Sequence, residues 1–344
     1  MSFGENSSDE DFADCEDDDI ENMRKFSIQS WFDRDVSGGD SSSKQISSAK
    51  LTWSNISVQV AEKKESRFKR IFRKVFRRQN ITAEKPKILN NVSGCAECGE
   101  LLAILGPSSS GKTTLLNALR KQVFGNLVTS GVVAINGKPV KRPMMKRLSS
   151  YVYQDDMFIG SLTVIEHLRF MATMKMGRRV DAAERERRIQ NAIRMLGLSK
   201  CADAVIGNEK RIKGISGGEK KRLSFASEIL MCPPILFCDE PTSGLDAFHA
   251  LQIVQTLKQL ASTMNMTILL TIHQPSSQMV KLFDKVLLLA KGQVIFTGKI
   301  SDALPLWEKA GNPLPMNYNP ADHFMKTLTT LDTPGADKST VLKI

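Results

Sequence analysis

The residues best suited to chemistry in this sequence form a glycine- and serine-rich run that ends in Lys112 and Thr113. The run follows a continuously apolar segment, 101–105, and opens a predicted helix. In that setting, backbone N–H groups can curl around phosphate oxygens, and the helix N-terminus adds positive potential. Lys112 can then reach the β- and γ-phosphates, and the Thr113 hydroxyl can ligate Mg²⁺. The expected nucleotide-binding residues are Gly106, Pro107, Ser108, Ser109, Ser110, Gly111, Lys112, Thr113 and Thr114.

A second chemical group closes the apolar run 235–238 with two acids, Asp239 and Glu240. An aspartate at the end of a buried strand suits the Mg²⁺ shell, usually through water. Glu240 can act as the general base that polarises an attacking water. Many strands end in solvated charges, so this pair gains its meaning from following the phosphate loop.

Between these two sites, residues 215–219 read Ile-Ser-Gly-Gly-Glu. Two glycines expose backbone N–H groups at a helix N-terminus and Ser216 adds a hydroxyl, so the segment can bind a γ-phosphate from outside. Ser216 and Glu219 are also compatible with a simple capped helix. The residues expected to face a partner's nucleotide are Ser216, Gly217, Gly218 and Glu219.

Together with Gln154, Ser-Gly-Leu-Asp at 243–246 and His273, these motifs resemble, in the same order, those of the ABC-type ATP-binding domain. The resemblance implies that Gln154 senses Mg²⁺ and contacts a membrane domain. It also implies that Asp246 belongs to the D-loop and that His273 is the switch histidine at the γ-phosphate. The expected catalytic residues are Glu240, His273 and Gln154, and the expected Mg²⁺ ligands are Thr113, Gln154 and Asp239.

The sequence between and around the motifs, over about residues 50–328, resembles the G subfamily and specifically its White-like members. The segments that carry this resemblance are 154–163, 239–246, 271–277 and 317–322. In that family an ATPase domain precedes a six-helix membrane domain, and two half-transporters form a homo- or heterodimer. Two ATP molecules are sandwiched head to tail, and closure moves a small hydrophobic or amphipathic substrate. The sequence departs from the usual pattern at Val60, where many ABC proteins place an aromatic residue against adenine.

Strands and helices alternate around these motifs, which predicts an α/β fold with a mainly parallel sheet. Strands are expected at 51–60, 87–92, 101–105, 132–135, 235–238 and 267–272, and helices at 113–121, 163–175, 181–196, 247–262 and after Gly218. The resemblance implies a P-loop NTPase fold of the ABC ATPase type, with an antiparallel β subdomain and a helical signature subdomain at about 155–232. The nucleotide-binding domain is expected over 49–328, between a disordered acidic and Ser-rich segment, 1–48, and a tail, 329–344, where a membrane domain begins in full-length relatives.

The formal net charge of +11 is unevenly distributed. Residues 63–78 hold nine basic residues and one acidic residue, a net +8, within a basic insertion expected at 62–80. If 66–78 is helical, it has one apolar face, formed by Phe68, Ile71, Phe72, Val75 and Phe76. That pattern is typical of an interfacial helix on anionic lipid or of a calmodulin-type target, and a solvated insertion is an equal alternative. No nucleic-acid partner is expected.

No apolar run reaches the roughly 18–20 residues that span a bilayer. The six cysteines and the polar start of the chain indicate reduced thiols in the cytosol. Cys95-x-x-Cys98 is interpreted as a turn, because no second pair lies at zinc-binding spacing. The leading hypothesis is a membrane-associated ATPase domain on the cytoplasmic face, with a membrane domain in cis or on a partner. The alternative is a truncated or soluble ATPase-domain protein that regulates an ABC partner without transporting; a native chain that continues past Ile344 would distinguish transport from regulation.

Overall fold

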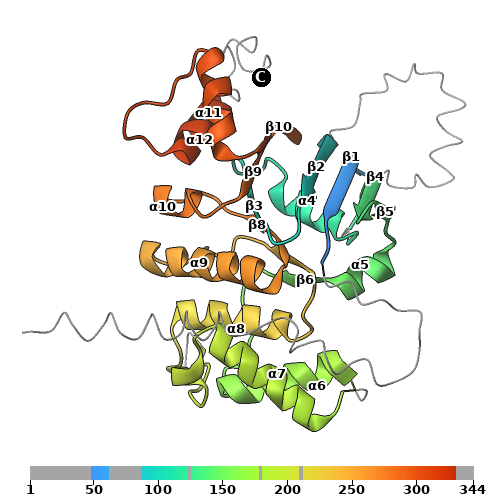
Figure 1. Cartoon of the computed structure of the whole chain (residues 1–344), viewed down its shortest axis with the longest axis vertical. Helices are drawn as coiled ribbons and strands as arrows, with labels where there is room; N and C mark the ends of the chain where they lie inside the picture. The colour runs from blue at the N-terminus through green and yellow to red at the C-terminus, as the bar shows by residue number, and fades with distance from the viewer. Residues whose placement is uncertain (1–47, 62–86, 123–124, 178–179, 209–211, 331–344) are drawn as a thin grey trace, which may run out of the picture.

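The computed structural model describes residues 48–61, 87–122, 125–177, 180–208 and 212–330 of the chain (Figure 1). The expected basic insertion at 62–80, with its apolar set Phe68, Ile71, Phe72, Val75 and Phe76, lies outside the described residues. Residues 1–47 and 331–344 lie outside them as well.

A six-stranded sheet forms the centre of the molecule, with the strand order β10-β9-β3-β8-β7-β6. In that order the strands are Gln293–Gly298, Lys285–Ala290, Leu101–Leu105, Thr267–Thr271, Ile235–Cys238 and Ser149–Val152. β3 pairs in parallel with β8 and β9, and β7 pairs in parallel with β6 and β8. Only the β10–β9 pair is antiparallel within this sheet. The prediction of a mainly parallel core sheet is confirmed.

The sheet is covered on both faces, which explains why β3 is apolar at every position. Successive strand residues point to opposite faces. Leu101, Ala103 and Leu105 enter one buried cluster, whereas Leu102 and Ile104 enter a second. All five are fully buried, as expected for a strand between two layers.

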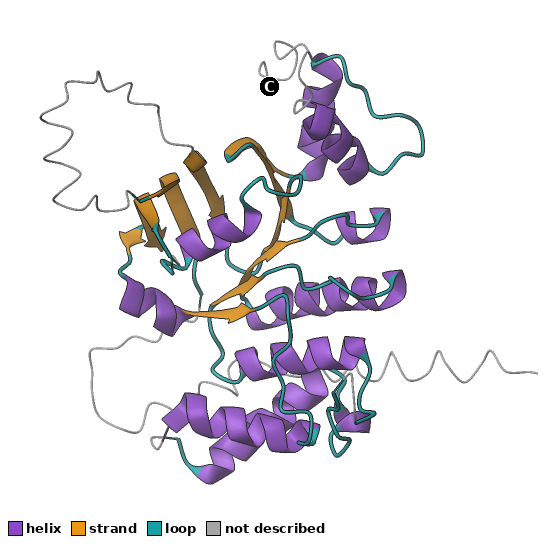
Figure 2. Cartoon of the chain, turned by 180° about the vertical axis from the view of Figure 1, so that it is seen from behind, coloured by secondary structure: helices purple, strands orange, loops and turns teal. Residues whose placement is uncertain are grey.

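A second, antiparallel sheet has the order β2-β1-β4-β5. Its strands are Lys87–Ala96, Leu51–Val60, Leu127–Ile135 and Lys138–Pro139. β2 and β4 are longer than the apolar runs predicted for them, because β1 provides pairing partners along its whole length. The helix α4, Lys112–Leu119, lies between the two sheets (Figure 2). Its Leu115 and Leu116 share a buried cluster with residues of both sheets.

A further group of helices covers the outer face of the core sheet or extends from its ends (Figure 1). They are α5 Arg142–Leu148, α9 Ala247–Met264, α10 Ser277–Val280, α11 Ile300–Lys309 and α12 Pro320–Thr330. In the C-terminal pair, the buried rings of Trp307 and Phe324 pack with centroids 4.5 Å apart. This contact anchors α12 to α11.

Three helices gather at the end of the molecule that lies away from the antiparallel sheet (Figure 2). They are α6 Val164–Met176, α7 Ala182–Met195 and α8 Gly217–Ile229, with a 3₁₀ turn at Ser199–Cys201. Buried side chains of all three enter the same cluster as Leu101 and Leu105 of β3. Within the described ranges, no helix has both the length and the apolarity needed to cross a bilayer.

Candidate active site

The phosphate loop connects β3 to α4, and two of its glycines are required by the space around them. A Cβ on Gly106 would lie 2.2 Å from the Leu289 carbonyl oxygen, closer than any real contact. Gly111 has φ of 100°, a conformation that side chains disfavour, and a Cβ there would lie 2.8 Å from Leu89. The loop is therefore pressed against neighbouring backbone, which leaves its opposite side for a ligand.

Lys112, at the first position of α4, is 6% exposed and folds back onto the loop. Its Nζ donates to the carbonyl oxygens of Gly106 at 2.8 Å and Pro107 at 3.1 Å. Burial lowers the pKa of Lys112, and the nearby acids Glu240 and Asp239 oppose that shift. The Ser110 hydroxyl is buried and has no hydrogen-bond partner among the described residues. Both groups are therefore able to bind an oxygen-rich anion.

Asp239 is buried at the carboxyl end of β7 and accepts three hydroxyl hydrogen bonds. Thr113 donates to its Oδ1 at 3.0 Å, and Thr271 donates to the same oxygen at 2.7 Å. Tyr151 donates to Oδ2 at 3.0 Å. Burial, followed by the charge of Asp239, raises the pKa of Tyr151, so the phenol remains a donor. The sequence motifs predicted no role for Tyr151 in β6 or for Thr271 at the end of β8, although both strands pair with β7.

The expected Mg²⁺ ligands are brought together only in part. The hydroxyl of Thr113 and the carboxylate of Asp239 lie side by side, and both are hard oxygen donors of the kind that Mg²⁺ prefers. These residues fit the ion. Gln154 follows β6 and its side chain is directed elsewhere: Nε2 donates to the Ser243 hydroxyl at 3.4 Å. The hydrogen bonds found in the described part of the chain do not join Gln154 to the other two.

Glu240 and His273 follow the neighbouring strands β7 and β8. Glu240 adopts a left-handed backbone conformation, with φ of 44°, and its N–H donates to the Thr271 hydroxyl at 2.8 Å. Thr271 thus holds both acids of the pair. His273 follows β8, and its Nε2 shares a hydrogen bond of 2.7 Å with the Ser108 hydroxyl of the phosphate loop. Residues from the ends of three neighbouring strands therefore meet at one edge of the core sheet.

The signature segment begins α8 with a complete capping box. The Ser216 N–H donates to Glu219 Oε2 at 2.7 Å, and the Glu219 N–H donates to the Ser216 hydroxyl at 3.3 Å. Gly218 is packed against α9, where a Cβ would lie 2.9 Å from the ring of His249. Asp246 caps α9 and pairs with the same histidine. The contacts found for the described residues do not join this signature to the phosphate loop of its own chain.

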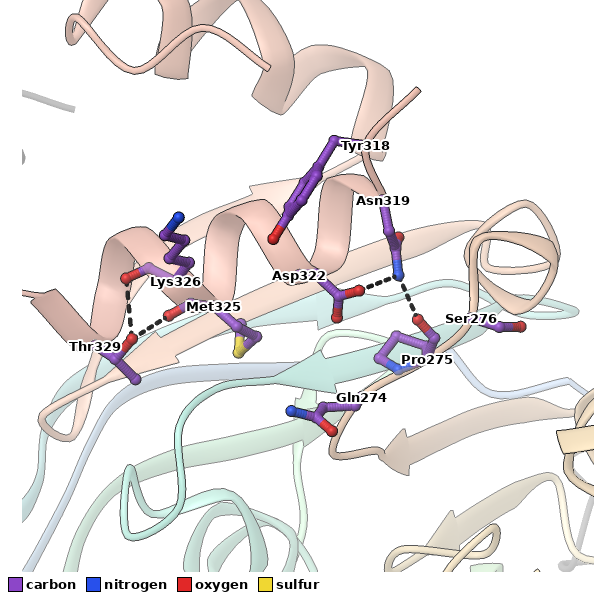
Figure 3. A pocket seen from close by; sticks show the side chains of 9 residues that line it. All are labelled: Gln274, Pro275, Ser276, Tyr318, Asn319, Asp322, Met325, Lys326 and Thr329. Atoms are coloured by element: carbon purple, nitrogen blue, oxygen red, sulfur yellow. Dashed lines mark hydrogen bonds between the residues drawn. The ribbon is translucent and has the colours of Figure 1, made fainter. Parts of the chain in front are cut away.

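A pocket of about 670 Å³ lies beside the loop that follows His273 (Figure 3). Its lining residues are Gln274, Pro275, Ser276, Tyr318, Asn319, Asp322, Met325, Lys326 and Thr329. Asn319 holds the two sides of this region together, because its Nδ2 donates to the Pro275 carbonyl at 2.8 Å and to Asp322 at 3.0 Å. None of the lining residues belongs to the phosphate loop, so this pocket is separate from the expected nucleotide site.

Cys95 and Cys98 are free thiols near the turn between β2 and β3. The Cys98 thiol donates to the Asn265 carbonyl at 3.0 Å. In the part of the chain that the structure describes, no group of three or more His, Cys, Asp or Glu side chains could hold a metal ion.

This fold and site define an ATP-binding domain of the ABC class. The ABC transporter family model matches residues 89–243, and the ABC-2 type transporter model matches 273–343. Among solved structures, the fold resembles that of CbiO1 from Clostridium perfringens, described as part of an ABC transporter complex. The TM-score is 0.57 at 21% identity, covering 76% of this chain and 92% of that one.

The relatives narrow the assignment. The chain is 48% identical over 294 residues to the ABC transporter ATP-binding protein/permease wht-1 of Caenorhabditis elegans, covering 85% of this chain and 43% of that protein. It is 49% identical to protein white of Drosophila melanogaster, covering 75% and 38%, and 47% identical to protein scarlet of the same species, covering 74% and 37%. The chain belongs to the ABC transporter family, in its White-like G-type group. It spans less than half the length of these three relatives.

Proposed function

We propose that this chain binds and hydrolyses ATP as the ATPase part of a White-like half-transporter, and so powers movement of a small hydrophobic or amphipathic substrate across a membrane. One observation carries the ATPase part of the proposal. The phosphate loop after β3, the two acids after β7 and the histidine after β8 are joined by the hydrogen bonds Thr113–Asp239 and Ser108–His273. Catalysis of phosphoryl transfer requires this kind of positioning and charge stabilisation.

In the proposed mechanism, the loop backbone and Lys112 bind the phosphates of the substrate ATP. Thr113 and Asp239 would hold Mg²⁺, which when bound neutralises phosphate charge. Glu240 accepts the proton of the attacking water as general base. The hydrogen bond from its N–H to Thr271 fixes the backbone of Glu240, so its carboxylate is held at the strand end. His273, bonded to Ser108 of the phosphate loop, would contact the γ-phosphate, and Gln154 would sense Mg²⁺.

The proposed active unit is a head-to-tail dimer with an identical or related half-transporter. Two observations support it. The capped signature helix presents the N–H group of exposed Gly217 at its N-terminus, where an anion is favoured. The signature has no contact with its own phosphate loop among those found for the described residues. A two-fold, isologous interface brings the signature of each chain to the phosphate loop of the other.

Exposed apolar side chains in the loop after Gln154 and on α6 support docking to a membrane domain on the cytoplasmic side. Met157 and Ile159, in the loop after Gln154, are 86% and 53% exposed. Phe170 and Met174 are 48% and 69% exposed, and their spacing places them on one face of α6. Large apolar side chains gathered on a surface mark an interaction site. We propose that a membrane domain, in cis or on a partner, covers this surface.

The relatives favour transport over the alternative of a lone regulator, because wht-1 of Caenorhabditis elegans is named an ATP-binding protein/permease. An immunoblot of membrane and soluble fractions, with an antibody to residues 1–48, separates the two. We expect a membrane band much larger than 38.2 kDa. A soluble band at that mass would favour regulation.

The sequence of the basic insertion also supports contact with anionic lipid. We propose that Phe72 and Phe76 insert between lipid headgroups, where each nearby Lys or Arg contributes about 1 kcal/mol. The test is sedimentation with vesicles containing phosphatidylserine. The double substitution Phe72→Asp and Phe76→Asp should abolish vesicle binding, and unchanged binding would reject lipid contact.

The ATPase proposal is tested by separating nucleotide binding from hydrolysis. Lys112→Ala should weaken ATP binding at least tenfold, because an ion pair with phosphate is worth about 1.5–3 kcal/mol. Glu240→Gln should retain ATP binding and lower the hydrolysis rate about a hundredfold or more. Filter binding and phosphate release measure the two quantities. Hydrolysis at the wild-type rate by Glu240→Gln would reject Glu240 as the base.

A further inference from the structure

Lys221 is a buried lysine on the signature helix α8, five residues after the cap Ser216. It is 2% exposed and lies on the same inward face as Gly218 and Phe225, three residues before it and four after it. Lysine almost never occupies such a position unless its ammonium group is paired. The identity of its partners therefore indicates why a lysine stands there.

All three partners come from the segment that carries Gln154. The Lys221 Nζ donates to the Gln154 carbonyl at 2.9 Å, to the Tyr153 carbonyl at 3.1 Å and to Asp156 Oδ1 at 3.0 Å. An ammonium group has three N–H donors, so each donor has one acceptor. One side chain thus joins α8, which begins with the signature, to the backbone of residues 153–156, here called the glutamine loop.

The side chains of Tyr153 and Gln154 make weaker contacts than the carbonyl groups of the same two residues. The Tyr153 side chain lies at the surface, and the residue is 52% exposed. The Gln154 side chain makes a hydrogen bond of 3.4 Å to Ser243, at the long limit for such a bond. The Lys221 contacts are shorter and carry a charge, which makes them stronger. The position of the Gln154 backbone therefore depends on Lys221.

We infer that Lys221 is a positioning residue that sets where Gln154 lies and links that position to the signature helix. This inference rests on the proposed function, since Gln154 matters to the site only if the chain binds ATP and Mg²⁺. Lys221 acts through the Gln154 carbonyl, and none of its hydrogen bonds within the described part of the chain reaches the phosphate loop. Because Lys221 and the signature belong to one helix, a shift of α8 displaces the Gln154 backbone with it.

The test is binding of a fluorescent ATP analogue to the whole chain at increasing Mg²⁺ concentration. Lys221→Met keeps a similar length and removes all three donors. The half-saturating Mg²⁺ concentration should rise about tenfold, as for other outer residues that orient a metal site. Binding of the analogue without Mg²⁺ should remain unchanged. Asp156→Asn keeps the acceptor but removes its charge, and should raise the half-saturating concentration about threefold.

Two neighbours serve as matched controls. Lys220→Met removes the adjacent lysine of the same helix, and Asp155→Asn removes an exposed acid of the same loop. Both should leave the half-saturating Mg²⁺ concentration unchanged. A purely structural role for Lys221 would lower the melting temperature and the binding amplitude, but the half-saturating concentration would stay at the wild-type value.

The outcomes distinguish the inference from the function on which it rests. If the wild-type chain shows no Mg²⁺-dependent ATP binding, both fail. If the wild type shows it and both Lys221→Met and Asp156→Asn match the wild type, only the inference fails. If Lys221→Met does not fold, the comparison of Asp156→Asn with Asp155→Asn decides.

Discussion

Asp239 illustrates how the site depends on single hydroxyl groups. Its carboxylate is buried, and three hydroxyls, from Thr113, Thr271 and Tyr151, donate to it. A buried charge is tolerated only when its oxygens are satisfied in this way. Two of the three hydroxyls come from strands on either side of β7, which are distant in sequence. The motifs therefore indicated the acid but not the groups that hold it.

His167 is a buried histidine outside the site, and it predicts how stability depends on pH. It lies on α6, and its Nε2 shares a hydrogen bond of 3.1 Å with the hydroxyl of Ser227 on α8. Burial, followed by the charge of Lys175, lowers the pKa of His167 to about 4. Between pH 6.5 and 4, the His167 imidazole binds a proton more readily in the unfolded chain than in the folded chain. Stability from this group is therefore complete above pH 6.5 and is lost progressively as pH falls toward 4.

We expect the free energy of unfolding to fall by about 2 kcal/mol more between pH 7 and pH 5 in the wild type than in His167→Gln. Urea denaturation at the two pH values measures this difference. Equal losses in the two proteins would show that the folded-state pKa of His167 is not lowered.

At the scale of elements, the sequence predicted the strands and helices whose residue pattern lies within the element itself. The apolar runs at 101–105 and 235–238 and the capped helix after Ser216 are present as expected. The lengths of β2 and β4 were underestimated, because their outer residues are held by pairing with β1 and not by apolar alternation. The link from α8 to the glutamine loop was also missed. A lysine within a basic run, Lys220 to Arg222, gives no sign in sequence that one of its members is buried.

The strand β8 provides a test of how an element positions the two acids. Thr271→Val keeps the shape of the side chain but removes the hydroxyl that donates to Asp239 and accepts from the Glu240 N–H. Losing these contacts should cost about 1–3 kcal/mol of stability, because buried polar groups are left unpaired. The hydrolysis rate should fall about tenfold or more, since the Glu240 backbone is no longer fixed.

The control lies on the same strand. Thr267 is fully buried and its hydroxyl donates to the Ala49 carbonyl, away from the site. Thr267→Val should lower the melting temperature by a similar amount while hydrolysis per folded chain stays normal. Equal loss of hydrolysis in both variants would mean that β8 supports the fold alone.

At the scale of the whole molecule, the phosphate loop and the signature segment belong to different parts of the fold. The phosphate loop and Asp239 lie at the carboxyl edge of the core sheet. The signature lies at the start of α8, where Ser216 and Glu219 cap the helix and Gly218 packs against His249. Family resemblance gave the reason for this separation, and the residues alone could not, because a capped helix has the same local pattern.

The central claim is that two chains share each ATP site, and sedimentation velocity of the Glu240→Gln chain tests it most directly. With saturating Mg-ATP, the 38.2 kDa chain should convert to a species of twice that mass that holds two ATP molecules. Adding Gly217→Asp should abolish the dimer while each monomer still binds ATP. The aspartate suits the first turn of α8 but repels a phosphate there. A chain that stays monomeric with ATP bound, or a Gly217→Asp variant that dimerises equally well, would contradict the account.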